Sequence, residues 1–144
     1  MKFLNYIKRG LALILVIFSL CLVFPSPSYA TTLEGSVWKL KSGLGPTQVS
    51  NSDITIKFKD GSFSGSTGCN SYGGEYTLES KDKTSGKIKL SNTSNTFKLC
   101  SGEVGEQEVK FLTALEKVKE YQLTDKGLVL PYPSPSRYLL FTQQ

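Results

Sequence analysis

The sequence contains no histidine among its 144 residues. This absence excludes a Ser-His-Asp triad and a Cys-His pair, and it removes the commonest general base and the commonest transition-metal ligand of proteins. Cysteine is also scarce: the chain has three, and no C-x-x-C motif occurs. The sequence therefore lacks the spacing of a zinc site or of a thioredoxin-like redox motif. We expect no catalytic residue, no metal ligand and no cofactor.

Other catalytic patterns are missing or weak. The glycines between Gly61 and Gly74 do not have the spacing that cradles a phosphate, so neither a P-loop nor a dinucleotide fingerprint is present. Two carboxylates facing each other across a cleft would still permit acid–base chemistry. The acidic residues, however, fall mostly at turns and on outward strand positions, and we interpret them as solvated surface. They are Asp53, Asp60, Glu75, Glu79 and the glutamates of the predicted helix. We therefore expect the protein not to be an enzyme.

The longest hydrophobic run lies at the N-terminus. Three basic residues precede fourteen mostly apolar ones (11–24), two prolines follow, and the segment ends in S-Y-A at residue 30. That order predicts a signal peptide over residues 1–30, cleaved after Ala30. A transmembrane anchor would need about 20 apolar residues, and a lipid anchor at Cys21 would need a small residue in place of Leu20. We therefore expect an exported protein (periplasm, lumen or extracellular medium) that meets a membrane only through its uncleaved signal peptide.

Residues 31–144 have the length of one domain and a nearly balanced charge. Three of the seventeen basic residues precede residue 31 and all twelve acidic residues follow it, so this part carries fourteen basic residues and a net charge of +2. The basic residues alternate along the predicted strands instead of clustering. We therefore expect no nucleic-acid partner, and we expect a monomer.

Short segments of alternating polarity dominate this domain and are typical of β-strands. Residues 54–59 place Ile54, Ile56 and Phe58 on one face. The Asp60-Gly61 pair that follows favours a type I′ hairpin, in which Phe58 would lie opposite Phe63. The other expected strands are 38–41, 75–79, 87–90, 121–123, 128–130 and 138–142, with Tyr76, Leu78, Ile88 and Leu90 facing inward.

One stretch, residues 105–119, has a different period. Phe111, Leu115 and Val118 recur at i, i+4 and i+7, Leu112 widens this stripe, and acidic residues precede basic ones as the helix dipole favours. We expect one amphipathic helix that caps an open end or face of the sheet. The predicted fold class is therefore mainly β, a compact antiparallel barrel-like sheet with a single helix.

Two cysteines, Cys69 and Cys100, lie outside the predicted signal peptide. Two such thiols usually pair in the oxidising surroundings of an exported protein. A disulfide that closes a loop of roughly thirty residues stabilises a fold by about 3–4 kcal/mol. The alternative is two separate, buried thiols that act as small apolar residues. We favour the disulfide.

The region around Cys69 is rich in glycine and small polar residues. Gly68 and Gly74 permit positive φ or close backbone approach, and the short amide of Asn70 can bond neighbouring backbone groups. One interpretation is a rigid loop that presents Asn70 and Tyr72 to a partner. The other is a demanding connection between strands whose residues serve the fold. We favour the second and retain Gly68, Asn70, Tyr72 and Gly74 as a candidate interaction loop.

These residues also carry a resemblance. The patterns G-C-N-x-x-x-G-x-Y from Gly68, T-x-x-x-C from Thr96 and L-x-L from Leu128, with the acidic, apolar helix among them, resemble the META domain of the HslJ family over about residues 33–143. Lys98 departs from the family, whose members usually carry methionine there. The resemblance implies a compact antiparallel β-barrel-like fold with one helix. It also implies an exported or lipid-anchored bacterial protein, related to a heat-shock-induced one, without an established enzymatic activity.

Together these inferences predict an exported, non-catalytic META-domain protein, associated with the envelope or with stress, that binds an envelope protein or a small ligand. One alternative is an inhibitor of an envelope hydrolase that uses residues 65–74 as a wedge, which an exposed tip at residues 70–72 would favour. The other is a β-barrel carrier of a small apolar ligand, which needs a hollow interior. The aromatic residues expected to fill a small barrel instead are Trp38, Phe58, Phe63, Tyr76 and Phe141.

Overall fold

The computed structural model describes residues 32–45, 52–82, 84–100, 102–133 and 137–144. All of them belong to Thr31–Gln144, the second of two units into which the chain divides at Ala30. The predicted signal peptide and its cleavage site after Ala30 lie outside the described residues. No helix of the described part is long and apolar enough to cross a membrane.

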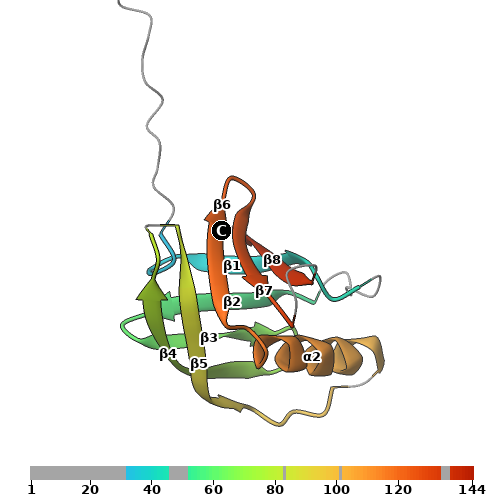
Figure 1. Ribbon diagram of the computed structural model, residues 1–144. Coiled ribbons are helices and arrows are strands. Elements are labelled where there is room, and N and C mark those ends of the chain that lie inside the picture. Colours follow the sequence, from blue (N-terminus) through green and yellow to red (C-terminus); the bar gives the residue numbers. More distant parts are fainter. Residues whose placement is uncertain (1–31, 46–51, 83, 101, 134–136) are drawn as a thin grey trace, which may run out of the picture. The chain divides into compact units, whose positions relative to one another are not determined.

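Eight antiparallel strands form a closed barrel, in which each strand pairs with the next and the last returns to the first (Figure 1). The strands are β1 (Val37–Ser42), β2 (Ile54–Lys59), β3 (Ser62–Thr67), β4 (Ser71–Ser80), β5 (Ser85–Asn95), β6 (Glu120–Thr124), β7 (Gly127–Pro131) and β8 (Tyr138–Gln143). The predicted fold class, a mainly β barrel with one helix, is confirmed.

The hairpin of β2 and β3 has the predicted register. Asp60 and Gly61 have φ values of 50° and 76°, as both central residues of a type I′ turn require. Phe58 lies opposite Phe63, and their ring centroids are 6.5 Å apart. This aromatic pair faces the inside of the barrel and helps to fix the register of the two strands.

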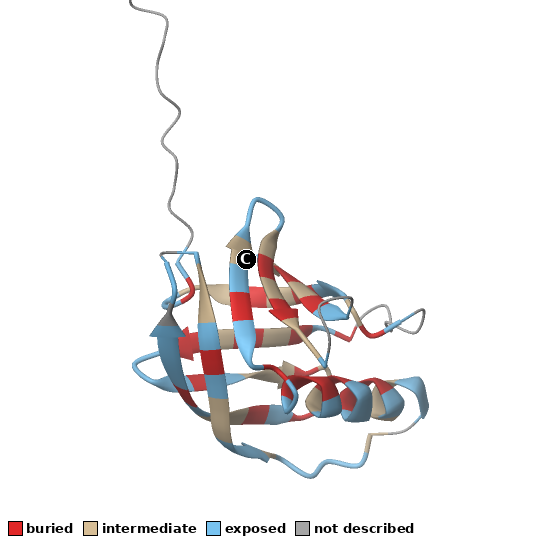
Figure 2. Cartoon of the chain, in the orientation of Figure 1, coloured by how far each residue is buried: buried red, intermediate tan, exposed pale blue. Residues whose placement is uncertain are grey.

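The barrel interior is filled by side chains that alternate along the strands (Figure 2). All five aromatic residues predicted to fill it are buried: Trp38, Phe58, Phe63, Tyr76 and Phe141. Leu78 lies on the predicted inner face, opposite buried Ile88, but it is 37% exposed. Beyond Glu75, β4 pairs with β5 but not with β3, so that part of its inner face has less cover.

The helix found in the described residues, α2 (Gly102–Leu115), begins and ends earlier than the predicted 105–119. Its end tightens because the Val118 amide bonds a carbonyl three residues back, at 3.1 Å. The Lys119 carbonyl then accepts a hydrogen bond of 2.9 Å from the Ile88 amide of β5, so the chain has already joined the sheet. Val118 is buried all the same. The apolar periodicity therefore continues past the last residue of the helix. For this reason the prediction placed the end of the helix too late.

Helix α2 covers the end of the barrel at which β3 ends and β4 begins (Figure 1). The Phe111 ring packs edge-on against Tyr72 of β4, with centroids 5.3 Å apart. The buried residues of the helix are Gln107, Glu108, Phe111, Ala114 and Leu115. Two of these five are polar. Glu108 meets the turn between β3 and β4, and Gln107 Nε2 donates to Ser52 Oγ, before β2, at 2.9 Å.

The opposite end of the barrel, at the Asp60-Gly61 turn, is covered by the chain before β1. Leu33 is buried there, and its carbonyl accepts a hydrogen bond from Trp38 Nε1 at 3.3 Å. Glu34 Oε1 accepts from the Asp60 amide at 2.7 Å and from the Tyr76 hydroxyl at 2.8 Å. The two ends of the barrel are therefore closed by different segments, each with one glutamate as an acceptor.

Candidate functional site

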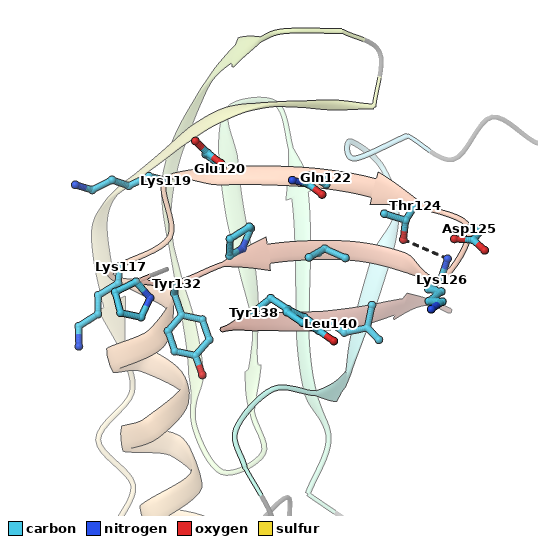
Figure 3. A pocket seen from close by; sticks show the side chains of 13 residues that line it. Lys117, Lys119, Glu120, Gln122, Thr124, Asp125, Lys126, Tyr132, Tyr138 and Leu140 are labelled. Carbon is cyan, nitrogen blue, oxygen red and sulfur yellow. Dashed lines mark hydrogen bonds between the residues drawn. The ribbon is translucent and has the colours of Figure 1, made fainter. Parts of the chain in front are cut away.

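A hollow of about 720 Å³ lies on the outer face of β6, β7 and β8 (Figure 3). Outward side chains of the strands, such as Val129 and Leu140, form its floor, and lysines lie along its rim. Its two carboxylates, Glu120 and Asp125, lie at opposite ends of β6 (Figure 3). They do not face each other as an acid–base pair would. This hollow therefore lacks convergent chemistry.

The turn between β3 and β4 is much more tightly organised. The Thr67 amide donates to the Asn70 carbonyl at 2.8 Å, and the Asn70 amide donates to Thr67 Oγ1 at 2.9 Å. Gly68 has a φ of 92°, and a Cβ on it would collide with the hydroxyl of Ser52. The T-G-C-N sequence is thus a closed turn that needs glycine at its second position.

Asn70 points into the molecule and is 3% exposed. Its Oδ1 accepts hydrogen bonds from the Lys98 amide and from the Thr96 hydroxyl, both at 2.8 Å. Its Nδ2 lies 3.2 Å from the Lys98 carbonyl. The side chain thus binds residues 96–98 much as a neighbouring strand would, and it holds them to the turn.

Tyr72 and Gly74 also serve the fold. Tyr72 is 4% exposed, and its hydroxyl donates to the Thr55 carbonyl at 2.8 Å. Burial raises the pKa of Tyr72 well above its usual range. A Cβ on Gly74 would lie 2.9 Å from the Phe63 ring. Both residues belong to β4 and not to a loop. Because Asn70 and Tyr72 are both buried, the structure favours the interpretation in which these residues serve the fold over the one in which they are presented to a partner.

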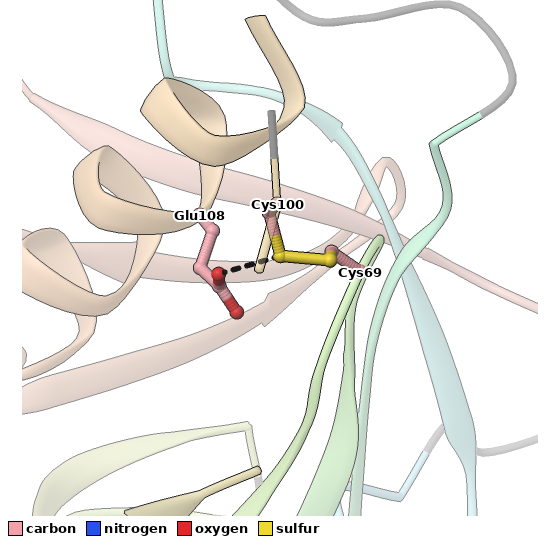
Figure 4. A group of neighbouring side chains, drawn as sticks. All are labelled: Cys69, Cys100 and Glu108. Carbon is pink, nitrogen blue, oxygen red and sulfur yellow. Dashed lines mark hydrogen bonds between the residues drawn. A yellow bond between two sulfur atoms is a disulfide. The ribbon is translucent and has the colours of Figure 1, made fainter. Parts of the chain in front are cut away.

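Cys69 and Cys100 form a disulfide with a Cα–Cα distance of 6.1 Å (Figure 4). It joins the turn between β3 and β4 to the irregular segment that follows β5. Because both cysteines are half-buried, the bond lies at the surface and not in the core. Gly105 permits helix α2 to approach, since a Cβ there would lie 2.5 Å from the Cys100 carbonyl oxygen.

Glu108 brings a buried carboxylate against this disulfide (Figure 4). It is 9% exposed. The Thr67 hydroxyl donates to its Oε1 at 2.6 Å, and Asn70 Nδ2 donates to its Oε2 at 3.1 Å. Its Oε2 lies 3.2 Å from Cys100 Sγ. The two sulfurs and this oxygen lie within 4.8 Å of one another, but the sulfurs are bonded to each other and are not free to bind a metal.

Residues 96–100, called here the clamped segment, carry two large apolar side chains on their outer side. Phe97 is 93% exposed and Leu99 is 99% exposed, while Val109 of α2 is 65% exposed. We call these three residues the apolar patch. Between the clamped segment and α2 lies a groove of about 570 Å³, lined by Leu99, Val109, Cys100 and Glu108 among others.

Sequence reasoning missed Glu108, which it assigned with the other helix glutamates to solvated surface. A usable pattern was present, because Glu108 precedes Phe111 by three residues and Leu115 by seven and so shares their face. A carboxylate on an apolar helix face should have been expected to need partners. No sequence pattern indicated the exposure of Phe97 and Leu99. It follows from the contacts of their neighbours, because Thr96 bonds Asn70 and Cys100 bonds Cys69.

The closed barrel with one capping helix defines a class of small antiparallel β domains. Within that class, this chain is distinguished by the disulfide that joins its G-C-N turn to its T-x-x-x-C segment. A family model of the META domain matches residues 31–144, and the chain belongs to this family. An NMR structure of a protein from Burkholderia xenovorans has the same fold, with a TM-score of 0.58 and 22% identity over 85% of this chain and 92% of that chain. No curated protein matches the chain.

Proposed function

We propose that this META-domain protein is an exported, non-catalytic and monomeric binding module that docks a partner protein of the envelope onto its apolar patch. The observation that carries the proposal is the nearly complete exposure of Phe97 and Leu99 on a segment that is held in place. Large apolar side chains on a surface mark interaction sites when they gather beside a groove.

The rigidity of the clamped segment supports this proposal. Asn70 binds its backbone at both the amide and the carbonyl of Lys98, and the disulfide fixes its end. An anchored segment loses little conformational entropy when a partner covers it. Burial of one Phe or Leu side chain is worth about 1.5–3 kcal/mol. Two such side chains can therefore provide most of the affinity of a modest interface.

The two alternatives from the sequence have less support. An inhibitor that uses residues 65–74 as a wedge would need exposed side chains there, but Asn70 and Tyr72 are buried. A carrier would need space inside the barrel, which Trp38, Phe58 and Phe141 occupy with no exposed surface. A partner on the outside of the barrel agrees with both observations.

A non-catalytic role also has chemical support. The buried carboxylate, Glu108, is engaged with Thr67 and Asn70, and the chain has no histidine. The disulfide is compatible with an exported protein. A place in the envelope, and an association with stress, are carried over from the family.

Site-specific photo-crosslinking in the cells that produce the protein tests this proposal. A photoreactive residue at Leu99 should join the chain to a partner, whereas one at Thr113, an exposed position on α2, should not. The partner identified in this way is then purified without the crosslink, and its affinity for this protein is measured by calorimetry. The F97S/L99S variant should bind it at least tenfold more weakly, because the loss exceeds about 1.4 kcal/mol.

The matched control is Tyr138→Ser, which removes another exposed large side chain, this one from the hollow on β6–β8. It should bind the partner within twofold of the wild type. Equal binding by F97S/L99S and wild type would overturn the proposal. A large loss in Tyr138→Ser alone would move the docking surface to the outer face of β6–β8.

A further inference from the structure

The neighbourhood of the disulfide has more hydrogen-bond acceptors than hydrogens. Asn70 Nδ2 has two hydrogens. Three acceptors lie within 3.2 Å of it: the Lys98 carbonyl, Glu108 Oε2 and Cys100 Sγ. If these hydrogens serve the two oxygens, the disulfide sulfur, a weak acceptor, receives none, and Glu108 Oε2 lies 3.2 Å from it with no hydrogen between them.

Reduction would supply the missing hydrogen. A disulfide sulfur has no hydrogen to donate, whereas a thiol has one. A thiol on Cys100 would lie 3.2 Å from Glu108 Oε2 and 3.4 Å from the Lys98 carbonyl, within reach of either acceptor. A buried carboxylate gains more from such a donor than a neutral group does. The equilibrium between disulfide and thiols should therefore lie further toward the thiols here than it would for a cysteine pair without a carboxylate beside it.

The groove beside the apolar patch gives access to this bond. Cys100, Glu108, Leu99 and Val109 all line it. A protein that covers the patch would thus lie over Cys100, one end of the disulfide. A protein with a reactive pair of thiols that docked on this patch would bring its thiols close to Cys100.

We propose that Cys69–Cys100 is a thiol–disulfide exchange site, that Glu108 holds the reduced Cys100 as its hydrogen-bond acceptor, and that the partner is a dithiol protein. The identity of this partner rests on the proposed function, since the dithiol protein would dock on the apolar patch. The redox property of the cysteine pair does not depend on docking.

The exchange proceeds in two steps. A partner thiolate attacks Cys69 Sγ, a partner–Cys69 disulfide forms, and the Cys69–Cys100 bond breaks with its electron pair on Cys100 Sγ. Asn70 Nδ2, 3.1 Å away, donates to this sulfur as it becomes a thiolate. Cys100 then takes a proton from solvent and donates to Glu108. The second partner thiol, as thiolate, attacks the partner's own sulfur in the mixed disulfide and releases Cys69, which is protonated. Two electrons and two protons pass from the partner to this chain.

The first experiment measures the redox equilibrium without a protein partner. The chain, purified after export, is equilibrated with dithiothreitol buffers, and the reduced fraction is counted by alkylation and mass spectrometry. Glu108→Gln should favour the disulfide about tenfold, or about 30 mV for this two-electron couple, because the amide can donate to a disulfide sulfur and is a weaker acceptor for a thiol. Glu106→Gln, on the exposed side of the same helix, should match the wild type. Equal equilibria for Glu108→Gln and wild type would overturn the exchange site.

A spectroscopic measurement covers the case in which Glu108→Gln does not fold. The infrared S–H stretch of the reduced wild type should include a band lowered by hydrogen bonding to a carboxylate, and Cys100→Ser should lose it while Cys69→Ser keeps it. A Cys100 S–H band at the frequency of a solvated thiol would overturn the role of Glu108.

The second experiment tests the partner class with a purified thioredoxin-type dithiol protein as the probe. F97S/L99S should be reduced by this protein at least tenfold more slowly than wild type, and by dithiothreitol at the same rate. If both rates are unchanged, the dithiol protein is not the partner of the patch. Crosslinking at Leu99 can still succeed in that case, so failure here is distinct from failure of the docking surface.

Discussion

The two ends of the barrel are closed by the same kind of group in very different settings. At one end Glu34 accepts from the Asp60 amide and the Tyr76 hydroxyl, two donors with good geometry. At the other end Glu108 accepts from Thr67 and shares the Asn70 amide with a carbonyl and a sulfur. At the first end two donors serve the carboxylate, whereas at the second end one amide is shared by two oxygens and a sulfur.

The surfaces of the two ends differ in the same way. The Glu34 end buries its apolar residue, Leu33, and adds a hydrogen bond from Trp38. The disulfide end leaves Phe97 and Leu99 almost fully exposed. One end thus satisfies its groups and covers its apolar surface, as a purely structural closure should. The other leaves large apolar side chains uncovered, as an end that meets a partner should.

Among changes at the disulfide end, removal of the disulfide should have the largest effect on stability. The cysteines are 31 positions apart, and loss of the bond in C69A/C100A should lower the free energy of unfolding by about 3–4 kcal/mol. Chemical denaturation measures this loss. Hydrogen exchange should accelerate at residues 96–100 and leave the Gly35 amide, bonded to the Phe58 carbonyl, protected. Equal acceleration at both ends would show that they are not independent.

Loss of the Asn70 side chain should rank second. Asn70→Ala removes the bonds that hold Thr96 and Lys98 and leaves their polar groups without this partner. A polar group orphaned in the interior costs about 1–3 kcal/mol. These groups are part-buried, so water can replace part of the loss, and we expect about 2–3 kcal/mol in urea denaturation. Asn95→Ala, which removes an exposed hydrogen bond, should change stability by less than about 0.5 kcal/mol. Similar losses in both variants would show that the Asn70 side chain does not hold the clamped segment.

Sequence reasoning succeeded where the determinants are local. The Asp60-Gly61 turn, the pairing of Phe58 with Phe63 and the alternation around Trp38 all follow from residues a few positions apart. The disulfide could be favoured from composition and from the expected compartment, because two thiols in a compact domain that is expected to be exported usually pair.

It failed where distant segments compete for the same residues. Helix α2 ends early because the Lys119 carbonyl bonds the Ile88 amide of β5. The apolar periodicity of the helix sequence gives no sign of that pairing. Asn70 is inside and Phe97 outside because the turn, the clamped segment and the helix meet there. The contacts of Asn70 with Thr96 and with Glu108 span 26 and 38 positions. Glu108 was the one member of this site that its helical face could have revealed.

The Glu34 end should respond to alkaline pH. Burial, followed by the hydrogen bond and the charge of Glu34, raises the pKa of Tyr76 to about 12. The unfolded tyrosine has its ordinary value of about 10, so the folded state holds its proton more tightly. The stability from Tyr76 is therefore full below pH 10 and is lost as the pH rises to 12.

Tyr76→Phe tests this end directly. At neutral pH it should cost about 1 kcal/mol, the worth of one hydrogen bond. Between pH 10 and 12 its stability should fall less steeply than that of the wild type, by about one proton in the slope of unfolding free energy against pH. Parallel slopes, measured by urea denaturation across this range, would show that Glu34 does not hold Tyr76 in its protonated form.

The smallest effect on stability should come from changes at Phe97 and Leu99, the residues on which the proposed docking surface depends. F97S/L99S removes side chains that are already 93% and 99% exposed, so folding gains almost nothing from them and the melting temperature should stay within about 2 °C of the wild type. The same double change at the Glu34 end, Leu33→Ser with Trp38→Ser, removes two buried side chains and should prevent stable folding. If F97S/L99S is strongly destabilised, the patch packs against something within the chain. It would then be part of the fold, and the contrast between the two ends would disappear.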